Sequence, residues 1–158
     1  MTGGAGYIGS VLVPMLLENG EQVTVFDKQL PAISSYAHTN QLQAVIGDVR
    51  DKTVVKASLE QVSSVIYLAG VSDGRAGKAN PRLTEEVNVE AFESFVHAAK
   101  AAGCRRFVFA STFGVYGYDY QEPLTEDLTP DPQEAYSASK LKAEQILQLL
   151  TIKSTSKQ

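Results

Sequence analysis

Hydrophobic and polar positions alternate along this chain in blocks that predict strands and helices in turn. Runs rich in β-branched residues lie at 22–26 (QVTVF) and 42–49 (LQAVIGDV). Nearly continuous apolar runs lie at 64–70 (SVIYLAG) and 106–112 (RFVFAST). All four have the length and composition of strands, and strands that are apolar on both faces are typical of a parallel sheet covered on both sides.

Between these runs, apolar residues recur at helical spacing and predict helices over 7–17, 51–62, 81–102 and 134–150. Asn19-Gly20 and Gly103 end the first and third helices with glycine caps, and Pro14 inside the first predicts a kink. A polar connection at 31–38, with Pro31, joins the first two strands. In a chain of 158 residues this alternation predicts one α/β domain, a doubly wound parallel sheet with helices on both faces.

A glycine-rich turn opens the chain. Gly3, Gly6 and Gly9 are spaced one residue wider than the usual dinucleotide fingerprint. Glycine is needed where a chain turns tightly, where backbone N–H groups contact a pyrophosphate and where a helix packs close to a sheet. The turn therefore predicts pyrophosphate binding at a helix N-terminus, although three glycines alone also fit an ordinary turn.

An acidic residue follows at the position where such a site needs one. Asp27 ends the first predicted strand, 18 residues after Gly9, where a carboxylate accepts hydrogen bonds from the adenosine ribose diol. Its charge repels a 2′-phosphate, which favours NAD over NADP, an inference that the neighbouring Lys28 weakens. Asp48 and Val49 end the next strand and are assigned to the adenine edge of the site, although Gly-Asp there is also a common turn.

A second set of residues fits proton transfer. YSASK places Tyr136 and Lys140 four residues apart, on one face of the last predicted helix. A cation close to a phenol lowers its pKa by roughly 1–3 units, so that the pair can exchange a proton with a hydroxyl while a cofactor takes a hydride. Ser111 and Thr112 end a strand at the carboxyl edge of the sheet, where a Thr hydroxyl can bind the reacting oxygen. Each motif also has an ordinary structural interpretation. Tyr136 and Lys140 fit a pair on a helix surface, and Ser111 and Thr112 fit a cap or turn.

Composition narrows the class of protein further. The 18 acidic and 14 basic residues give a net charge of -4 with no basic cluster, so no nucleic-acid partner is expected. No apolar run reaches ~20 residues and no secretory signal is recognisable, which predicts no membrane partner and a cytoplasmic location. Cys104 stands alone, and His38 and His97 lie in no ligand-like spacing, so no metal site is predicted.

Together, TGGAGYIGS, VFDK, GDV, YLAG, NVEA, STFGVYG and YSASK, in this order and spacing, resemble the extended short-chain dehydrogenases/reductases, the NAD-dependent epimerase/dehydratase family. The resemblance covers nearly the whole chain and implies a Rossmann fold, NAD as the cofactor and a nucleotide-sugar as the substrate. It implies Thr112, Tyr136 and Lys140 as catalytic residues. The implied cofactor contacts are Gly3, Gly6, Tyr7, Ile8, Gly9, Asp27, Lys28, Asp48, Val49, Leu68, Ala69, Gly70, Asn88, Ser111, Tyr136 and Lys140.

The chain departs from one branch of this family. The 4,6-dehydratases have Thr-Asp-Glu before VYG, whereas this chain has Thr112-Phe113-Gly114, which disfavours elimination of water. The resemblance then implies a 4-epimerase cycle in which Tyr136 takes a sugar hydroxyl proton while NAD takes the hydride and returns it to the other face. The alternatives are an NAD(P)-dependent reductase of the same family and a truncated, non-catalytic dinucleotide-binding fragment.

The resemblance also implies that two parts of the family's fold are missing. The first strand, about six apolar residues at the centre of the sheet, belongs directly before Thr2, and a lobe that binds the sugar nucleotide belongs after the last helix. We therefore expect a partial NAD-binding domain over 1–158. Without that first strand its neighbours either leave a gap or close over one another, which exposes strand edges and apolar surface and predicts low stability, weak NAD binding and homodimerisation through the gap.

Overall fold

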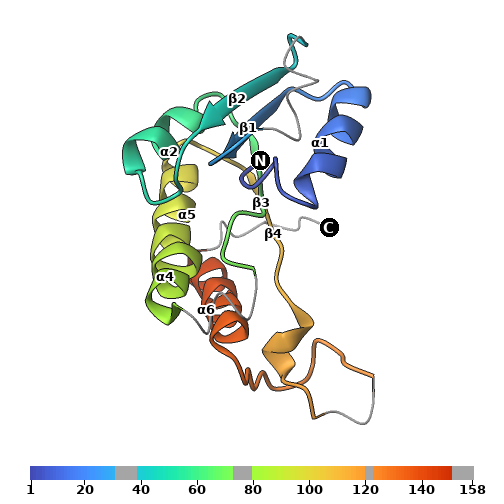
Figure 1. The fold of residues 1–158 in the computed structure, drawn as a ribbon, viewed down its shortest axis with the longest axis vertical. Coiled ribbons are helices and arrows are strands. Elements are labelled where there is room, and N and C mark those ends of the chain that lie inside the picture. The colour runs from blue at the N-terminus through green and yellow to red at the C-terminus, as the bar shows by residue number, and fades with distance from the viewer. Residues whose placement is uncertain (31–38, 73–79, 120–122, 151–158) are drawn as a thin grey trace, which may run out of the picture. The chain divides into compact units, whose positions relative to one another are not determined.

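The computed structural model describes residues 1–30, 39–72, 80–119 and 123–150 (Figure 1). The connection at 31–38, which includes Pro31 and His38, lies outside the described residues. Each strand and helix expected from the pattern is present, most of them a few residues shorter than expected. The order is α1 (Gly9–Glu18), β1 (Val23–Asp27), β2 (Leu42–Ile46), α2 (Lys52–Ser58), β3 (Ser64–Tyr67), α4 (Pro81–Glu85), η2 (Glu86–Glu90), α5 (Ala91–Ala101), β4 (Arg106–Phe109), η3 (Phe113–Tyr116) and α6 (Ala135–Leu150).

The chain forms two compact units. Unit 1 comprises Met1–Ala69 and His97–Ala110, and it holds all four strands together with α1 and α2. Unit 2 comprises Gly70–Val96 and Ser111–Gln158, and it holds α4, η2, η3 and α6. Residues of α5 belong to both units.

The strands of unit 1 form two parallel pairs. β1 pairs with β2, with Val23 opposite Leu42, and β3 pairs with β4, with Ser64 opposite Arg106. Parallel strands connected through helices are the arrangement that the alternating sequence pattern predicts. The connection between β3 and β4 includes the long helical segment that begins at α4.

Thr2 joins the two pairs of strands. It forms parallel bridges with Phe26 of β1 and with Tyr67 of β3. Its N–H donates to the carbonyl of Ile66 at 3.0 Å, and its carbonyl accepts from the N–H of Leu68 at 3.1 Å. The spatial order is therefore β2, β1, Thr2, β3, β4.

A cavity of about 790 Å³ lies beside Met1 in unit 1. Thr24 of β1 and Ile66 of β3 are among its lining residues. Residues of a strand point their backbone groups alternately to either side, and Phe26 and Ile66 both direct theirs toward Thr2 and its neighbours. The cavity therefore lies between β1 and β3, beside the residues that join them.

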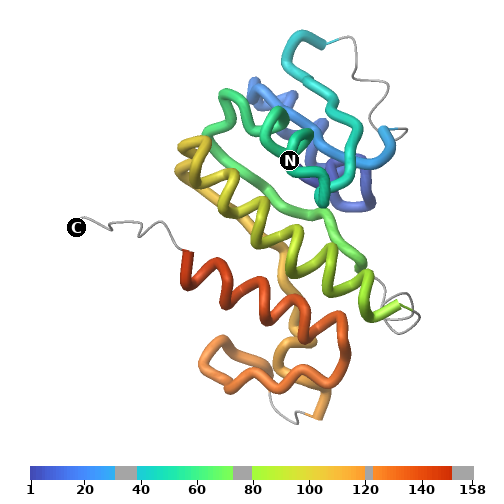
Figure 2. The backbone as a smooth tube through the Cα atoms, turned by 90° about the vertical axis from the view of Figure 1, so that its left-hand side faces the viewer, coloured from blue at the N-terminus to red at the C-terminus, as the bar shows by residue number. Residues whose placement is uncertain are grey.

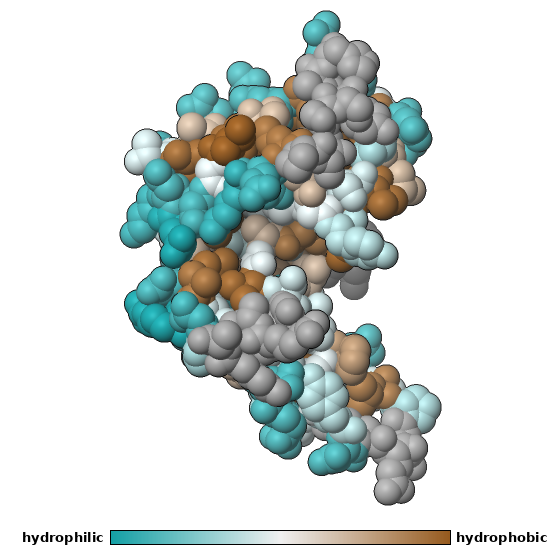
Figure 3. Space-filling view, viewed as in Figure 1, coloured by the Kyte–Doolittle hydropathy of each residue, from teal (hydrophilic) through white to brown (hydrophobic). Residues whose placement is uncertain are grey.

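One cluster of the core of unit 1 lies between α1 and β1. Val13 and Leu17 of the helix are buried together with Val23 and Val25 of the strand, and each such side chain contributes roughly 1.5–3 kcal/mol when it is fully buried. Some apolar side chains remain outside this core, as the hydrophobic areas in Figure 3 show. Ile46 on β2, for example, is 67% exposed.

Unit 2 is built around helices. Asn80 caps α4 by accepting a hydrogen bond from the N–H of Leu83 at 3.0 Å, and Pro81 occupies the first helical position. Figure 2 shows α6 beside this segment, where the Lys142 ammonium lies 2.7 Å from the Glu85 carboxylate. The sequence pattern predicts one uninterrupted helix over 81–102, but the structure has a π-helical turn at Glu86–Glu90, with Asn88 buried in it.

In the described part of the chain, no helix is both long and apolar enough to cross a membrane. The same residues contain no group of His, Cys, Asp and Glu side chains arranged to hold a metal ion. Cys104 is buried, and its Sγ lies 3.1 Å from the carbonyl oxygen of Val62, to which the thiol donates.

Candidate functional site

Close backbone contacts fix the glycine turn of unit 1. Gly3 has a φ of +67°, and a Cβ atom there would lie 2.8 Å from the backbone nitrogen of Ala69. At Gly9 a Cβ would lie 2.5 Å from the carbonyl oxygen of Gly3. Only glycine fits either position without displacing backbone, because real Cβ contacts are not this short. The turn is therefore pressed against the end of β3, and the start of α1 is pressed against the turn.

The first residues before α1 carry backbone donors that the protein leaves available. Tyr7 is 96% exposed and Ile8 is 56% exposed. Among the described residues, the backbone N–H groups of Tyr7 and Ile8 have no hydrogen-bond partner, whereas that of Ser10 donates to Gly6. Free N–H groups at the positive end of a helix dipole suit an anion such as a pyrophosphate.

Asp27 lies at the end of β1 and contacts this turn. Its Oδ2 accepts a 3.0 Å hydrogen bond from the backbone N–H of Ala5, and its Oδ1 accepts a longer one, 3.4 Å, from Gln29. A carboxylate has about four acceptor positions, so capacity remains for the hydroxyls of a ribose. The acid expected from the sequence is thus held against the glycine turn, although the two residues lie 22 positions apart in the sequence.

Asp48 is engaged by two cations. Its Oδ2 lies 2.7 Å from the Arg50 guanidinium and 2.9 Å from the Lys28 ammonium. Hydrogen bonds from Arg50, followed by the pairing with Lys28, hold the pKa of Asp48 well below its ordinary value. Val49 beside it is buried in the core. Arg50 was not singled out from the sequence, since a basic residue two positions after an aspartate is a common surface pair.

The end of β3 is bound to the start of the chain. The N–H of Leu68 donates to the Thr2 carbonyl, and that of Ala69 donates to the Thr2 hydroxyl oxygen at 3.2 Å. Gly70, the first residue of unit 2, is restricted by a neighbour within that unit, because a Cβ there would lie 2.9 Å from Oδ1 of Asn88.

Tyr136 and Lys140 lie on the first turns of α6 in unit 2. The Lys140 ammonium is 5.7 Å from the centroid of the Tyr136 ring, so the spacing in the sequence correctly predicts that they share a face. Lys140 is only 6% exposed, and this burial lowers its pKa from 10.5 to about 8. The prediction that the cation lowers the pKa of the phenol is wrong for this structure: burial raises the pKa of Tyr136. Burial removes water from the phenolate, which disfavours the charged form.

Thr112 has the structural role that its motif also allows. It is extended, with φ of -147°, and its Oγ accepts a 3.2 Å hydrogen bond from the Gly114 N–H at the start of η3. The hydroxyl therefore acts as a helix cap, and its hydrogen remains available for donation.

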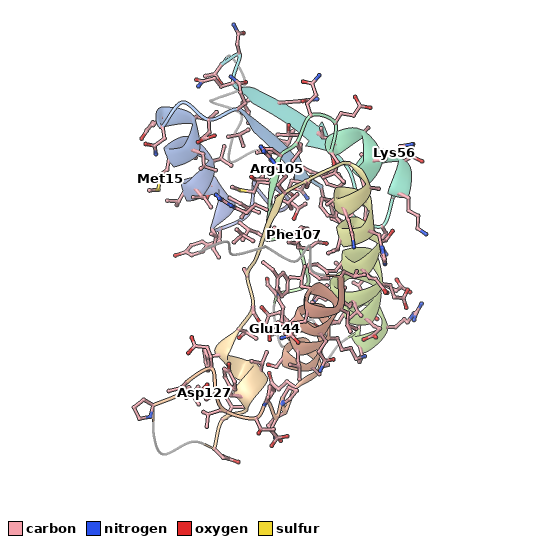
Figure 4. All side chains as sticks on the ribbon, turned by 180° about the vertical axis from the view of Figure 1, so that it is seen from behind. Met15, Lys56, Arg105, Phe107, Asp127 and Glu144 are labelled. Carbon is pink, nitrogen blue, oxygen red and sulfur yellow. The ribbon has the colours of Figure 1, made fainter. Side chains whose placement is uncertain are left out.

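Ser111 is held from α6. Its hydroxyl donates to the carboxylate of Glu144, which Figure 4 labels on that helix. Glu144 follows Lys140 by one helical turn and was not singled out from the sequence. Helical spacing places it near Lys140, but no sequence pattern indicated its contact with Ser111.

Asn88 is 5% exposed and all its polar atoms are engaged within unit 2. Its Oδ1 accepts from the N–H of Val71 at 2.8 Å. Its Nδ2 donates to the Val71 carbonyl and to the Ser139 hydroxyl, both at 3.0 Å.

The parallel strands, the glycine turn and the acid at the end of β1 define a Rossmann-type dinucleotide-binding fold. Residues 1–154 match the NAD dependent epimerase/dehydratase family, and the chain belongs to this family. It is 31% identical to the UDP-glucose 4-epimerase of Streptomyces lividans over 157 residues, covering 93% of this chain and 45% of the relative. It is 33% identical to the UDP-glucose 4-epimerase of Corynebacterium glutamicum over 141 residues, covering 89% and 43%.

Solved structures of a 4-epimerase and a 4,6-dehydratase have a fold similar to that of this chain. The UDP-glucose 4-epimerase of Thermus thermophilus in complex with NAD superposes with a TM-score of 0.84 at 31% identity, over 94% of this chain and 49% of that one. The dTDP-glucose 4,6-dehydratase DesIV of Streptomyces venezuelae, with NAD bound, gives a TM-score of 0.88 at 28% identity, over the same 94% and 49%. The chain spans about half the length of these relatives.

Proposed function

We propose that this chain binds NAD with residues of unit 1 and catalyses hydride transfer on a nucleotide-sugar with residues of unit 2, as a UDP-hexose 4-epimerase. The observation that carries the proposal is the carboxylate of Asp27 bonded to the glycine turn at Ala5. Relatives named UDP-glucose 4-epimerase and a related structure with NAD bound support it.

The proposed cofactor contacts follow from the chemistry of unit 1. The N–H groups of Tyr7 and Ile8 would hold the pyrophosphate, because they are the donors that the turn leaves available. Asp27 would accept hydrogen bonds from the adenosine ribose, and its charge would disfavour a 2′-phosphate. The other proposed contacts in unit 1 are Gly3, Gly6, Gly9, Lys28, Asp48, Val49, Leu68 and Ala69.

The proposed proton transfers use unit 2. NAD, when bound, supplies the acceptor for the sugar hydride and returns it, so none is consumed. Tyr136 would take the proton of the sugar hydroxyl and give it back, with the Thr112 hydroxyl donating to the same oxygen. Lys140, whose pKa is about 8, carries its charge at neutral pH and lies on the same helix face as Tyr136. Phe113 and Gly114 offer no carboxylate for dehydration.

The proposal is tested by incubating the 158-residue chain with NAD and UDP-galactose and following UDP-glucose by proton NMR. We expect conversion by the chain and none by Tyr136→Phe. Absence of conversion at high protein concentration would contradict the proposal for this chain. NAD binding without conversion would instead identify a non-catalytic dinucleotide-binding protein, and reduction of a keto-sugar by added NADH without epimerisation would identify a reductase.

A further inference from the structure

A buried chain of hydrogen bonds crosses unit 2 from the segment after β3 to the first turn of α6. Asn88 donates to the Ser139 hydroxyl at 3.0 Å, and Ser139 donates to the carbonyl oxygen of Tyr136 at 2.6 Å. Ser139 is 2% exposed and Asn88 is 5% exposed. The same amide of Asn88 is bonded in both directions to the backbone of Val71.

The direction of each bond in this chain is determined by the groups involved. The Nδ2 group of Asn88 is a donor only, so the oxygen of Ser139 must accept from it. The hydroxyl hydrogen of Ser139 is then left for the carbonyl of Tyr136, which is a pure acceptor. The bidentate contact with Val71 fixes which end of the Asn88 amide is the nitrogen, because each end meets a backbone group of opposite kind.

The carbonyl of Tyr136 is a sensitive point in α6. In an α-helix it is also the acceptor for the N–H of the residue four positions later, which is Lys140. The Ser139 bond therefore acts on the helical turn that begins at Tyr136 and ends at Lys140. Serine hydroxyls that bond back to the preceding turn alter helix geometry locally, so this contact affects how the two side chains are presented.

We propose that Ser139, oriented by Asn88, is a positioning residue that holds Tyr136 and Lys140 in their arrangement for proton transfer. The inference rests on the proposed function for the roles of Tyr136 and Lys140. It assigns Asn88 a different role from the cofactor contact that the family resemblance implies, because the oxygen and both hydrogens of its amide are used by Val71 and Ser139.

The chain contains a matched control for the test. Ser137 lies on the same helix two residues earlier and is 1% exposed, but its hydroxyl has no hydrogen-bond partner in the described part of the chain. Ser137→Ala and Ser139→Ala therefore remove the same atoms from equally buried positions. Only Ser139→Ala removes a hydrogen bond to the turn that carries Tyr136 and Lys140.

The readout is the pKa of Lys140, measured by NMR titration of the chain with ¹³C-methylated lysines and assigned with Lys140→Arg. In Ser139→Ala a looser first turn admits water to the ammonium, so we expect the pKa to rise from about 8 toward 10.5, by roughly half a unit or more. Ser137→Ala is expected to leave the pKa of Lys140 unchanged. Ser139→Thr keeps the hydroxyl, so the pKa of Lys140 is expected to stay at the value of the unchanged chain.

Equal Lys140 pKa values in the two alanine variants would overturn the proposal, as would a Ser139→Ala variant that lowers only the melting temperature. If Ser139→Ala does not fold, Ser139→Cys is titrated in the same way, since it keeps the volume and weakens the donor. The titration uses neither NAD nor substrate. A chain that fails to bind NAD would therefore refute the proposed function and leave this test decisive.

Discussion

The carboxylate of Asp27, the last residue of β1, accepts a 3.0 Å hydrogen bond from the backbone N–H of Ala5 in the glycine turn. Two motifs that are separate in the sequence are thus one structural feature of unit 1. The bond uses one carboxylate oxygen to hold the turn and leaves most of the other oxygen's capacity for a ligand hydroxyl. The proposed NAD specificity depends on this residue more than on any other.

Thr2 is expected to contribute to stability well beyond its size, because it joins β1 to β3 and its hydroxyl oxygen accepts from Ala69. Thr2→Val keeps the shape and leaves the Ala69 N–H unsatisfied, which should lower the free energy of unfolding by about 1–3 kcal/mol. Urea denaturation measures the change. Thr53→Val, at an exposed position, is the control, and equal stabilities of the two variants would show that the Thr2 hydroxyl contributes nothing.

Burial of Lys140 predicts a pH-dependent stability. Its folded pKa of about 8 lies below its ordinary value of 10.5, so between these pH values the unfolded chain binds more protons. The free energy of unfolding should therefore rise with pH in this window, whereas below pH 8 the full cost of burying the charge applies.

Lys140→Met should remove this dependence and stabilise the chain at pH 7 by on the order of 3 kcal/mol. The comparison is made by urea denaturation of both proteins at several pH values below 10, before tyrosine ionisation contributes. Parallel stability curves for the two proteins would show that Lys140 is not held in a desolvated position.

Tyr136→Phe is expected to lower turnover of a UDP-hexose by roughly 10²–10⁴-fold, because it removes the group that exchanges the proton. Affinity for NAD should change little, since the ring is kept. Steady-state kinetics and calorimetry on the same preparation separate the two effects. A phenylalanine variant that turns over normally would exclude Tyr136 as the acid and base.

The cavity between β1 and β3 predicts self-association, because strand edges beside it offer backbone groups for pairing. Sedimentation velocity over a range of protein concentrations should show a dimer that increases with concentration. Thr24 lies on β1 and lines the cavity. Thr24→Pro removes its backbone donor and should weaken that dimer. A stable monomer at all concentrations would exclude the gap as an interface.

The strands, the helix pattern and the glycine turn could be predicted from the sequence because each is a local property of the chain. Gly3 illustrates this, since its positive φ and its contact with Ala69 both require glycine. The π turn around Asn88 could not be predicted, because the apolar pattern continues through it. The contact between Ser111 and Glu144 joins residues 33 positions apart, which no spacing rule connects.

The chemistry of the candidate site was predictable only in part. The spacing of Tyr136 and Lys140 indicated a shared face, but the sign of the Tyr136 pKa shift depends on burial, which requires the folded structure. The ion pair of the Lys28 ammonium with Asp48 also required the folded structure, because the two residues follow different strands.

The most direct test of the account is a calorimetric titration of the 158-residue chain with NAD and with NADP, repeated for Asp27→Asn and for the exposed control Asp127→Asn. We expect the chain and the control to bind NAD and to prefer it to NADP. Asp27→Asn should lose roughly 10–100-fold in NAD affinity, the value of a charged hydrogen bond, together with most of the preference. No binding of NAD by the chain, or equal binding by Asp27→Asn, would contradict the assignment of this carboxylate to the cofactor.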